Sequence, residues 1–278
     1  MVAAKRPFLP AGLILALSAS LAAAIGGEPA KHSDSQIAKR GSNSLALSGQ
    51  LPDRLDTGIA GSKNFTVLAP RGGHLADEVL SRAEELRVHI AIAWLGQELP
   101  EGKGLTHITV ELSKDKDEGL TLLAGPGRAV PGDNRMWLTT SRERATGSTL
   151  AHEVTHIVLA THFAKGMPVW VNEGIASLED DEQRHETRRE LVRQWARTGQ
   201  WPSLEKLLDQ RKIAPSDQAS YAASVSLTEF LLAKGDRREL ITFIERAQQE
   251  GWEAALNRSY GIRGVADLQR QWQTWAAR

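Results

Sequence analysis

The chain has 278 residues, of which 41% are hydrophobic and 24% charged, so it can bury the core of one large domain or two small ones. Its 34 lysines and arginines balance 34 aspartates and glutamates, and this balance argues against a nucleic-acid-binding protein. The chain contains no cysteine, which excludes disulfides, thiolate metal ligands and a lipid-modified cysteine.

The N-terminus has the order of charges and apolar residues that is typical of a secretory signal. Lys5 and Arg6 precede an apolar run from Phe8 to Leu21, and three alanines follow, ending at Ala24. We therefore expect residues 1–24 to be a signal peptide and the protein to be exported, either periplasmic or secreted. The run is shorter than the roughly 20 apolar residues that a membrane span needs, which favours cleavage over an uncleaved anchor and predicts no membrane span in the mature chain.

Residues 25–62 are rich in Gly, Ser, Ala, Asp and Lys and show no sustained apolar period, which predicts a disordered linker. This linker is either a tether or a removable pro-segment, and we favour the tether. We expect order to begin at Asn64, in a first subdomain over residues 63–181.

Short strands and long helices alternate in this subdomain. Alternating and β-branched runs predict strands at 64–68, 106–113 and 135–140, with a short strand or turn at 120–123. Apolar residues at helical spacing predict a helix over 75–95, which Gly96 ends. The fold class expected is therefore α+β, with a small mixed or antiparallel sheet.

Residues 146–181 carry the clearest motif, His-Glu-x-x-His at His152, Glu153 and His156. Residues four apart lie on one face of a helix, so both imidazoles can bind one cation, as in zinc peptidases. A catalytic zinc usually takes three protein ligands and leaves a fourth position open. Glu173, in Asn172-Glu173-Gly174 on a second helix beyond Pro168, is the candidate third ligand, so we expect one Zn²⁺ per chain.

From residue 182 to residue 278 the sequence predicts an all-helical C-terminal subdomain. Its helices are expected at 182–198, 203–209, 218–233, 237–250, 253–257 and 265–277, and Gly235, Gly251 and Gly261 separate the last ones.

The two motifs together resemble those of the gluzincin zinc peptidases, in which a glutamate on a second helix completes the His-Glu-x-x-His site. More narrowly, the chain is similar to bacterial peptidase MA-like families, whose helical C-terminal part resembles the segments 220–224 and 230–232. The resemblance implies a zincin-like catalytic domain followed by helices. The Gly-x-Met-x-Asn segment of zinc aminopeptidases is absent before His152, so we expect an endopeptidase rather than an exopeptidase.

The expected chemistry gives further residues a role. Glu153, next to a zinc ligand but outside the ligand set, is the candidate general base. Tyr221 lies in a stretch that resembles the family and is the candidate hydrogen-bond donor to the developing oxyanion. Asp180 and Glu179 are the candidate carboxylates that orient a ligating histidine, although a cluster of solvated acids explains them equally well.

In zinc peptidases of this architecture an edge strand pairs antiparallel with the extended substrate. We assign this role to the strand that contains Arg135, Met136, Trp137 and Leu138, with an ordinary core strand as the alternative.

Two functions remain open. The preferred one is a zinc peptidase acting on a peptide or protein substrate. The alternative is a catalytically idle zinc-binding module that recognises a protein or a cell-wall peptide through the same cleft. The presence of Glu153 favours the enzyme.

Overall fold

The computed structural model describes residues 16–19, 57–125 and 132–278. The predicted signal peptide therefore lies outside the described residues except for 16–19, and the predicted linker lies outside them except for 57–62.

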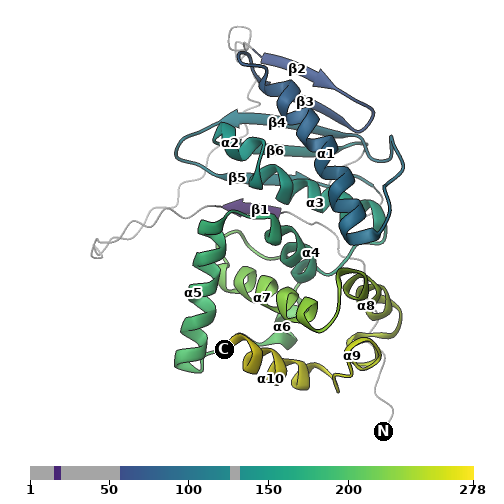
Figure 1. The fold of residues 1–278 in the computed structure, drawn as a ribbon, viewed down its shortest axis with the longest axis vertical. Coiled ribbons are helices and arrows are strands. Elements are labelled where there is room, and N and C mark those ends of the chain that lie inside the picture. Colours follow the sequence, from purple (N-terminus) through teal and green to yellow (C-terminus); the bar gives the residue numbers. More distant parts are fainter. Residues whose placement is uncertain (1–15, 20–56, 126–131) are drawn as a thin grey trace, which may run out of the picture.

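A mixed six-stranded sheet forms the first layer (Figure 1). The strand order is β1-β5-β6-β4-β3-β2. Strands β3 and β4 run parallel, as do β4 and β6, whereas the other neighbours are antiparallel. The bounds are β1 (Ala16–Ala19), β2 (Thr57–Gly61), β3 (Phe65–Pro70), β4 (Thr106–Leu112), β5 (Glu118–Leu122) and β6 (Asn134–Thr140).

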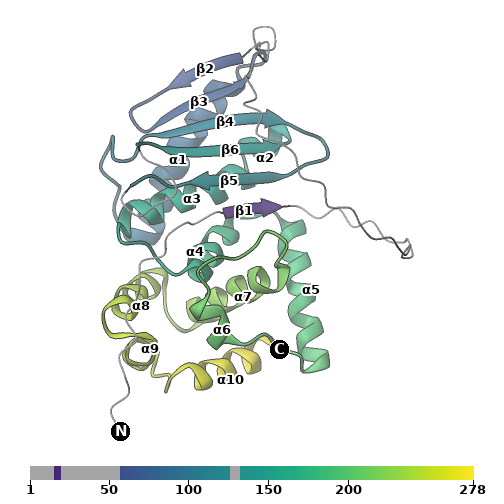
Figure 2. The same cartoon turned by 180° about the vertical axis from the view of Figure 1, so that it is seen from behind.

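Two long helices, α1 (Leu75–Leu95) and α3 (Ser148–His162), cover one face of this sheet, and the short α2 (Arg142–Ala145) precedes α3 (Figures 1 and 2). Alternate residues of the strands point into the layer between sheet and helices. Those that are buried include Phe65, Val67, Ile108, Val110, Met136 and Leu138. Each such side chain contributes roughly 1.5–3 kcal/mol relative to exposure, so period-two burial fixes which face of the sheet the helices cover.

The remaining helices gather on one side of the sheet layer (Figure 1). Helix α7 lies at their centre and packs against α4, α5 and α10. Their bounds are α4 (Val169–Ala176), α5 (Glu182–Thr198), α6 (Leu204–Asp209), α7 (Gln218–Lys234), α8 (Arg237–Glu250), α9 (Trp252–Tyr260) and α10 (Val265–Ala276), and a 3-10 turn, η1 (Ser177–Glu179), follows α4. The side chains of Asp181, Ser203, Asp217 and Asp236 cap the N-termini of α5, α6, α7 and α8, because each accepts a hydrogen bond from a backbone N–H of the first turn.

The predicted α+β class is confirmed, and α1 and α5 have the bounds expected from their apolar periods. The sheet begins earlier than expected, because Thr57–Gly61 forms β2 inside the predicted linker. Strand β2 lies at the sheet edge, where Ile59 is 73% exposed and only Ala60 is buried. An edge strand that buries one small residue leaves no alternating pattern to detect.

The role assigned to Arg135–Leu138 is wrong. Strand β6 pairs with β4 on one side and with β5 on the other, so both of its edges are already hydrogen-bonded. The strand at 118–122, expected only as a short strand or turn, is what covers β6. This strand, β5, also packs against α3, the helix that carries His152 and His156.

The search for membrane spans covered only the described residues. None of their helices combines the length and the apolar character that crossing a bilayer requires.

Candidate metal centre

Helix α3 carries three of the four central side chains. Every residue from Thr149 to Leu159 is buried, because α3 packs against β5 and β6 of the sheet and against α1, α4 and η1. His152 and His156 stand one turn apart, with ring centroids 4.9 Å from each other. Together with Glu153 they offer potential ligand atoms that all lie within 4.8 Å of one another, so this group could hold a metal ion.

Helix α4 brings Glu173 to the same point. The chain reverses after α3 at Gly166, whose φ of 85° favours glycine, and α4 begins after Pro168. Glu173 Oε2 lies 3.8 Å from His152 Nε2 and 4.0 Å from His156 Nε2. Ligands about 2 Å from a tetrahedral ion stand roughly 3.3 Å apart, so a small contraction of these side chains would complete a three-ligand site.

The same atoms lack other partners. Within the described part of the chain, Nε2 of His152, Nε2 of His156 and Oε2 of Glu173 are buried and make no hydrogen bond. Buried polar atoms without a partner are costly, and here three of them converge. Two imidazoles and a carboxylate are also a donor set of catalytic zinc sites, so the residues fit a divalent metal.

Asp180 orients the first of these histidines. Its Oδ1 lies 3.1 Å from His152 Nδ1, which leaves Nε2 of that ring directed toward Glu173. Two arginines of α5 hold the carboxylate: Arg184 Nη1 lies 3.1 Å from Oδ1 and Arg188 Nη2 lies 2.6 Å from Oδ2. Asp180 is therefore buried and paired, and the alternative that it belongs to a cluster of solvated acids is excluded.

Glu179, the other candidate, does not reach the histidines. It is half-buried on η1 and makes no side-chain hydrogen bond or ion pair with any described residue. The cause is the 3-10 turn, after which Asp180 adopts an extended conformation that aims it, rather than Glu179, at α3.

Burial and mutual charge govern the protonation of the centre. Burial raises the pKa of Glu153 to about 7 and that of Glu173 to about 8, despite the proximity of His152. Burial, with the charge of His152, lowers the pKa of His156 to about 3. Burial also lowers the pKa of His152, but the negative charges of Asp180, Glu153 and Glu173 outweigh the effect of burial. The net effect is a raised pKa of His152. The pKa of Asp180 is held far below its usual range, because His152, Arg188 and Arg184 outweigh the effect of its burial.

Tyr221 lies in the neighbourhood of these carboxylates. It is buried on α7, in a small cluster with Val169 and Ile213. Burial raises its pKa well above the ordinary range, and the charges of Glu173 and Glu153 add to the effect. The phenol is therefore protonated, and it lies close enough to Glu173 and Glu153 for their charges to affect it.

Several residues around the centre were not anticipated from the sequence. Thr121 donates a 2.6 Å hydrogen bond to Glu153 Oε2, and Gly119 of the same strand lies against that carboxylate. Asp117 joins β5 to α2, α3 and α5 through Arg144, Thr149 and Arg184. Only the arginines left a signal in the sequence: Arg184 and Arg188 stand one turn apart on a helix that directly follows Asp180.

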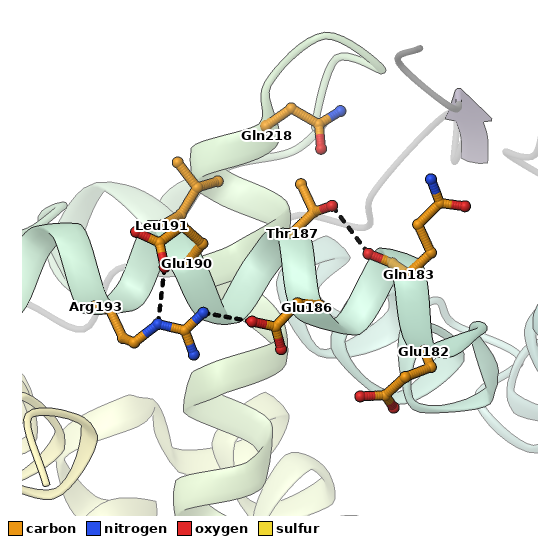
Figure 3. Close-up of a pocket in the computed structure, with 8 residues that line it drawn as sticks. All are labelled: Glu182, Gln183, Glu186, Thr187, Glu190, Leu191, Arg193 and Gln218. Atoms are coloured by element: carbon orange, nitrogen blue, oxygen red, sulfur yellow. Dashed lines mark hydrogen bonds and ion pairs between the residues drawn. The ribbon is translucent and has the colours of Figure 1, made fainter. Parts of the chain in front are cut away.

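The centre itself is closed to solvent, since His152, Glu153 and His156 are 0% exposed and Glu173 is 1% exposed. A hollow of about 810 Å³ lies instead against the outer face of α5 (Figure 3). Arg193 pairs there with Glu186 and Glu190, and no lining residue belongs to the metal centre. Its charged groups neutralise one another at the surface and suggest no chemistry.

Comparison with models of known protein families and with curated protein sequences finds no match.

Proposed function

We propose that this chain is an exported zinc-dependent peptidase of the gluzincin type, with a zincin-like fold, that cleaves within peptide chains. The observation that carries the proposal is the convergence of His152, His156 and Glu173 on one buried point, with Glu153 beside them. In the proposal these three residues bind one Zn²⁺, and Asp180 keeps His152 in the tautomer that ligation requires.

The reaction that follows is hydrolysis of an amide. When bound, zinc would supply Lewis-acid polarisation of the scissile carbonyl and would lower the pKa of a water molecule. Glu153 accepts a proton from the attacking water as the new C–O bond forms, and it delivers this proton to the amine nitrogen as the C–N bond breaks. The phenol of Tyr221 donates a hydrogen bond to the carbonyl oxygen while negative charge develops there.

Strand β5 is the proposed site of substrate alignment, in place of β6. Its outer edge accepts a strand in antiparallel register, as β1 does by pairing Ala16 with Thr121 and Ala19 with Glu118. Residues 16–19 belong to the predicted signal peptide, so its removal would leave this edge open to an extended peptide. The backbone of a substrate on this edge would run past Gly119 and Thr121, which contact Glu153.

A second candidate function, the catalytically idle zinc-binding module, is favoured by one observation. The ligands and Glu153 are entirely buried, as is usual for a structural metal site rather than for an open catalytic one.

Hydrolysis of a mixed peptide library by the purified, zinc-loaded protein separates the two candidates. The peptidase predicts internal cleavage of peptides, which a chelator abolishes and which Glu153→Gln reduces by roughly 10²–10⁴-fold while zinc stays bound. One zinc per chain without cleavage supports the idle module. Full activity of Glu153→Gln contradicts the proposed mechanism.

A further inference from the structure

Two residues of β5 contact the carboxylate of Glu153, although no motif in the sequence marks them. They stand two positions apart on the strand, so they face the same side of the sheet. Thr121 is 1% exposed, and its Oγ1 donates a 2.6 Å hydrogen bond to Glu153 Oε2. A hydroxyl bonded to a buried carboxylate forms a short, charge-assisted bond that restricts rotation of the carboxylate.

Gly119 leaves the space that the same carboxylate occupies. A Cβ at this position would lie 2.3 Å from Glu153 Oε1 and 2.7 Å from its Cδ, far inside contact distance. The backbone does not require glycine here, because Gly119 is absent from the residues with positive φ. The requirement is therefore spatial: Glu153 rests directly on the strand backbone.

Other strand glycines do not share this feature. A Cβ at Gly58 or Gly61 of β2 would meet no atom closer than 3.8 Å. The close approach at Gly119 is thus specific to Glu153 and does not reflect a general tightness of the sheet.

The strand is a firm support for this contact. Gly119 pairs with Leu138 and Thr121 pairs with Met136, and both partners are fully buried in β6. Residues that are hydrogen-bonded to a buried neighbouring strand have little freedom to move, whereas the glutamate side chain has three rotatable bonds.

We infer that Thr121 and Gly119 are positioning residues for Glu153. Thr121 fixes the plane of the carboxylate by its hydrogen bond to Oε2. Gly119 has no side chain, which leaves room for Oε1 to lie against the strand backbone. The consequence for rate rests on the proposed peptidase function. The consequence for the Thr121–Glu153 contact does not, so the two can be tested separately.

The kinetic test uses the zinc-loaded protein without the predicted signal peptide, residues 1–24, and a peptide that the wild type cleaves. Thr121→Val keeps the shape of the side chain but removes the hydroxyl, and we expect kcat to fall roughly tenfold to a hundredfold with KM and zinc content unchanged. Thr121→Ser restores the hydroxyl and should recover most of kcat. An unchanged kcat in Thr121→Val, or a failure of Thr121→Ser to recover, overturns the inference.

Gly119→Ala tests the spatial part, with Gly58→Ala as the matched control. We expect Gly119→Ala to lower kcat while one zinc per chain is retained, and Gly58→Ala to behave as the wild type. Equal activity of the two alanine variants overturns the role of Gly119.

A double-mutant cycle on thermal unfolding tests the contact without any activity. In the wild-type background Thr121→Val should lower Tm, and in a Glu153→Ala background the same change should lower Tm less, because the partner is gone. Equal shifts in both backgrounds overturn the inference. If the wild type cleaves no peptide but the cycle shows coupling, the peptidase proposal fails and the positioning of Glu153 by Thr121 stands.

Discussion

Asp180 Oδ1 accepts a 3.1 Å hydrogen bond from Nδ1 of His152, so the proton of that imidazole is committed to the side that faces away from Glu173. In the neutral imidazole, the ring nitrogen left toward Glu173 is then the unprotonated one, which is the form that binds a metal.

Asp180→Asn is therefore expected to weaken zinc binding by roughly 10–100-fold, because an amide supports the imidazole less well than a carboxylate. Competition with a chromogenic chelator measures the affinity. Glu179→Gln is the matched control, since Glu179 is the neighbouring acid and makes no side-chain bond with any described residue. Equal affinities for the two variants would remove Asp180 from the centre.

Glu173→Ala removes the only proposed ligand outside α3. We expect the zinc content, measured by elemental analysis after dialysis, to fall well below one per chain, because two histidines alone make a weak site. Glu186→Ala, on the outer face of α5, should retain its metal. Unchanged affinity in Glu173→Ala would show that Glu173 is not a ligand.

Gly174→Ala is expected to destabilise the protein and to weaken metal binding together. A Cβ at Gly174 would lie 2.2 Å from Thr228 Oγ1 and 2.7 Å from the backbone oxygen of Ser224, so α4 and α7 would have to separate. Such overpacking costs about 1–3 kcal/mol, and the shift moves Glu173, the preceding residue. Chemical denaturation and zinc titration measure the two effects. Gly61→Ala, where a Cβ has space, is the control.

The metal-free protein should lose stability as pH rises from about 6.5 to about 8. The folded-state pKa values of Glu153 and Glu173 are raised by burial to about 7 and about 8, so folding favours their protonated forms and this contribution disappears as they ionise. His152, whose pKa is also raised, acts in the same direction. His156, whose pKa is lowered to about 3, has its effect below pH 6.5, outside this window.

Thermal unfolding in the presence of a chelator measures this dependence. Glu173→Gln should flatten it, because one of the groups that titrate in this window is removed. Saturating zinc should reverse its sign, because a metal favours the ionised ligands and binds more tightly as pH rises. A Tm that rises with pH in the metal-free wild type would contradict the assignment.

Local sequence was enough to predict most of the elements. The apolar period of 75–95 and the caps and glycines around 182–198 predict α1 and α5 with the bounds observed, because these signals act within a few residues. The spacing of His152 and His156 likewise predicted that both imidazoles lie on the same face of the helix, because residues four apart are one turn apart.

Pairing between distant segments escaped prediction. Nothing local distinguishes β6 from an edge strand, because the residues that cover it belong to β5, and their hydrogen bonds are made by backbone groups that every residue except proline carries.

The sequence by itself determined which side chains could serve a metal: two histidines one turn apart, a glutamate between them and a second glutamate after a proline. The tertiary structure decided how they meet. The packing of α4 on α7 sets the position of Glu173, the η1 turn selects Asp180 over Glu179, and β5 brings Thr121 and Gly119 to Glu153. These relations depend on close packing between segments far apart in the chain, which local periodicity does not encode.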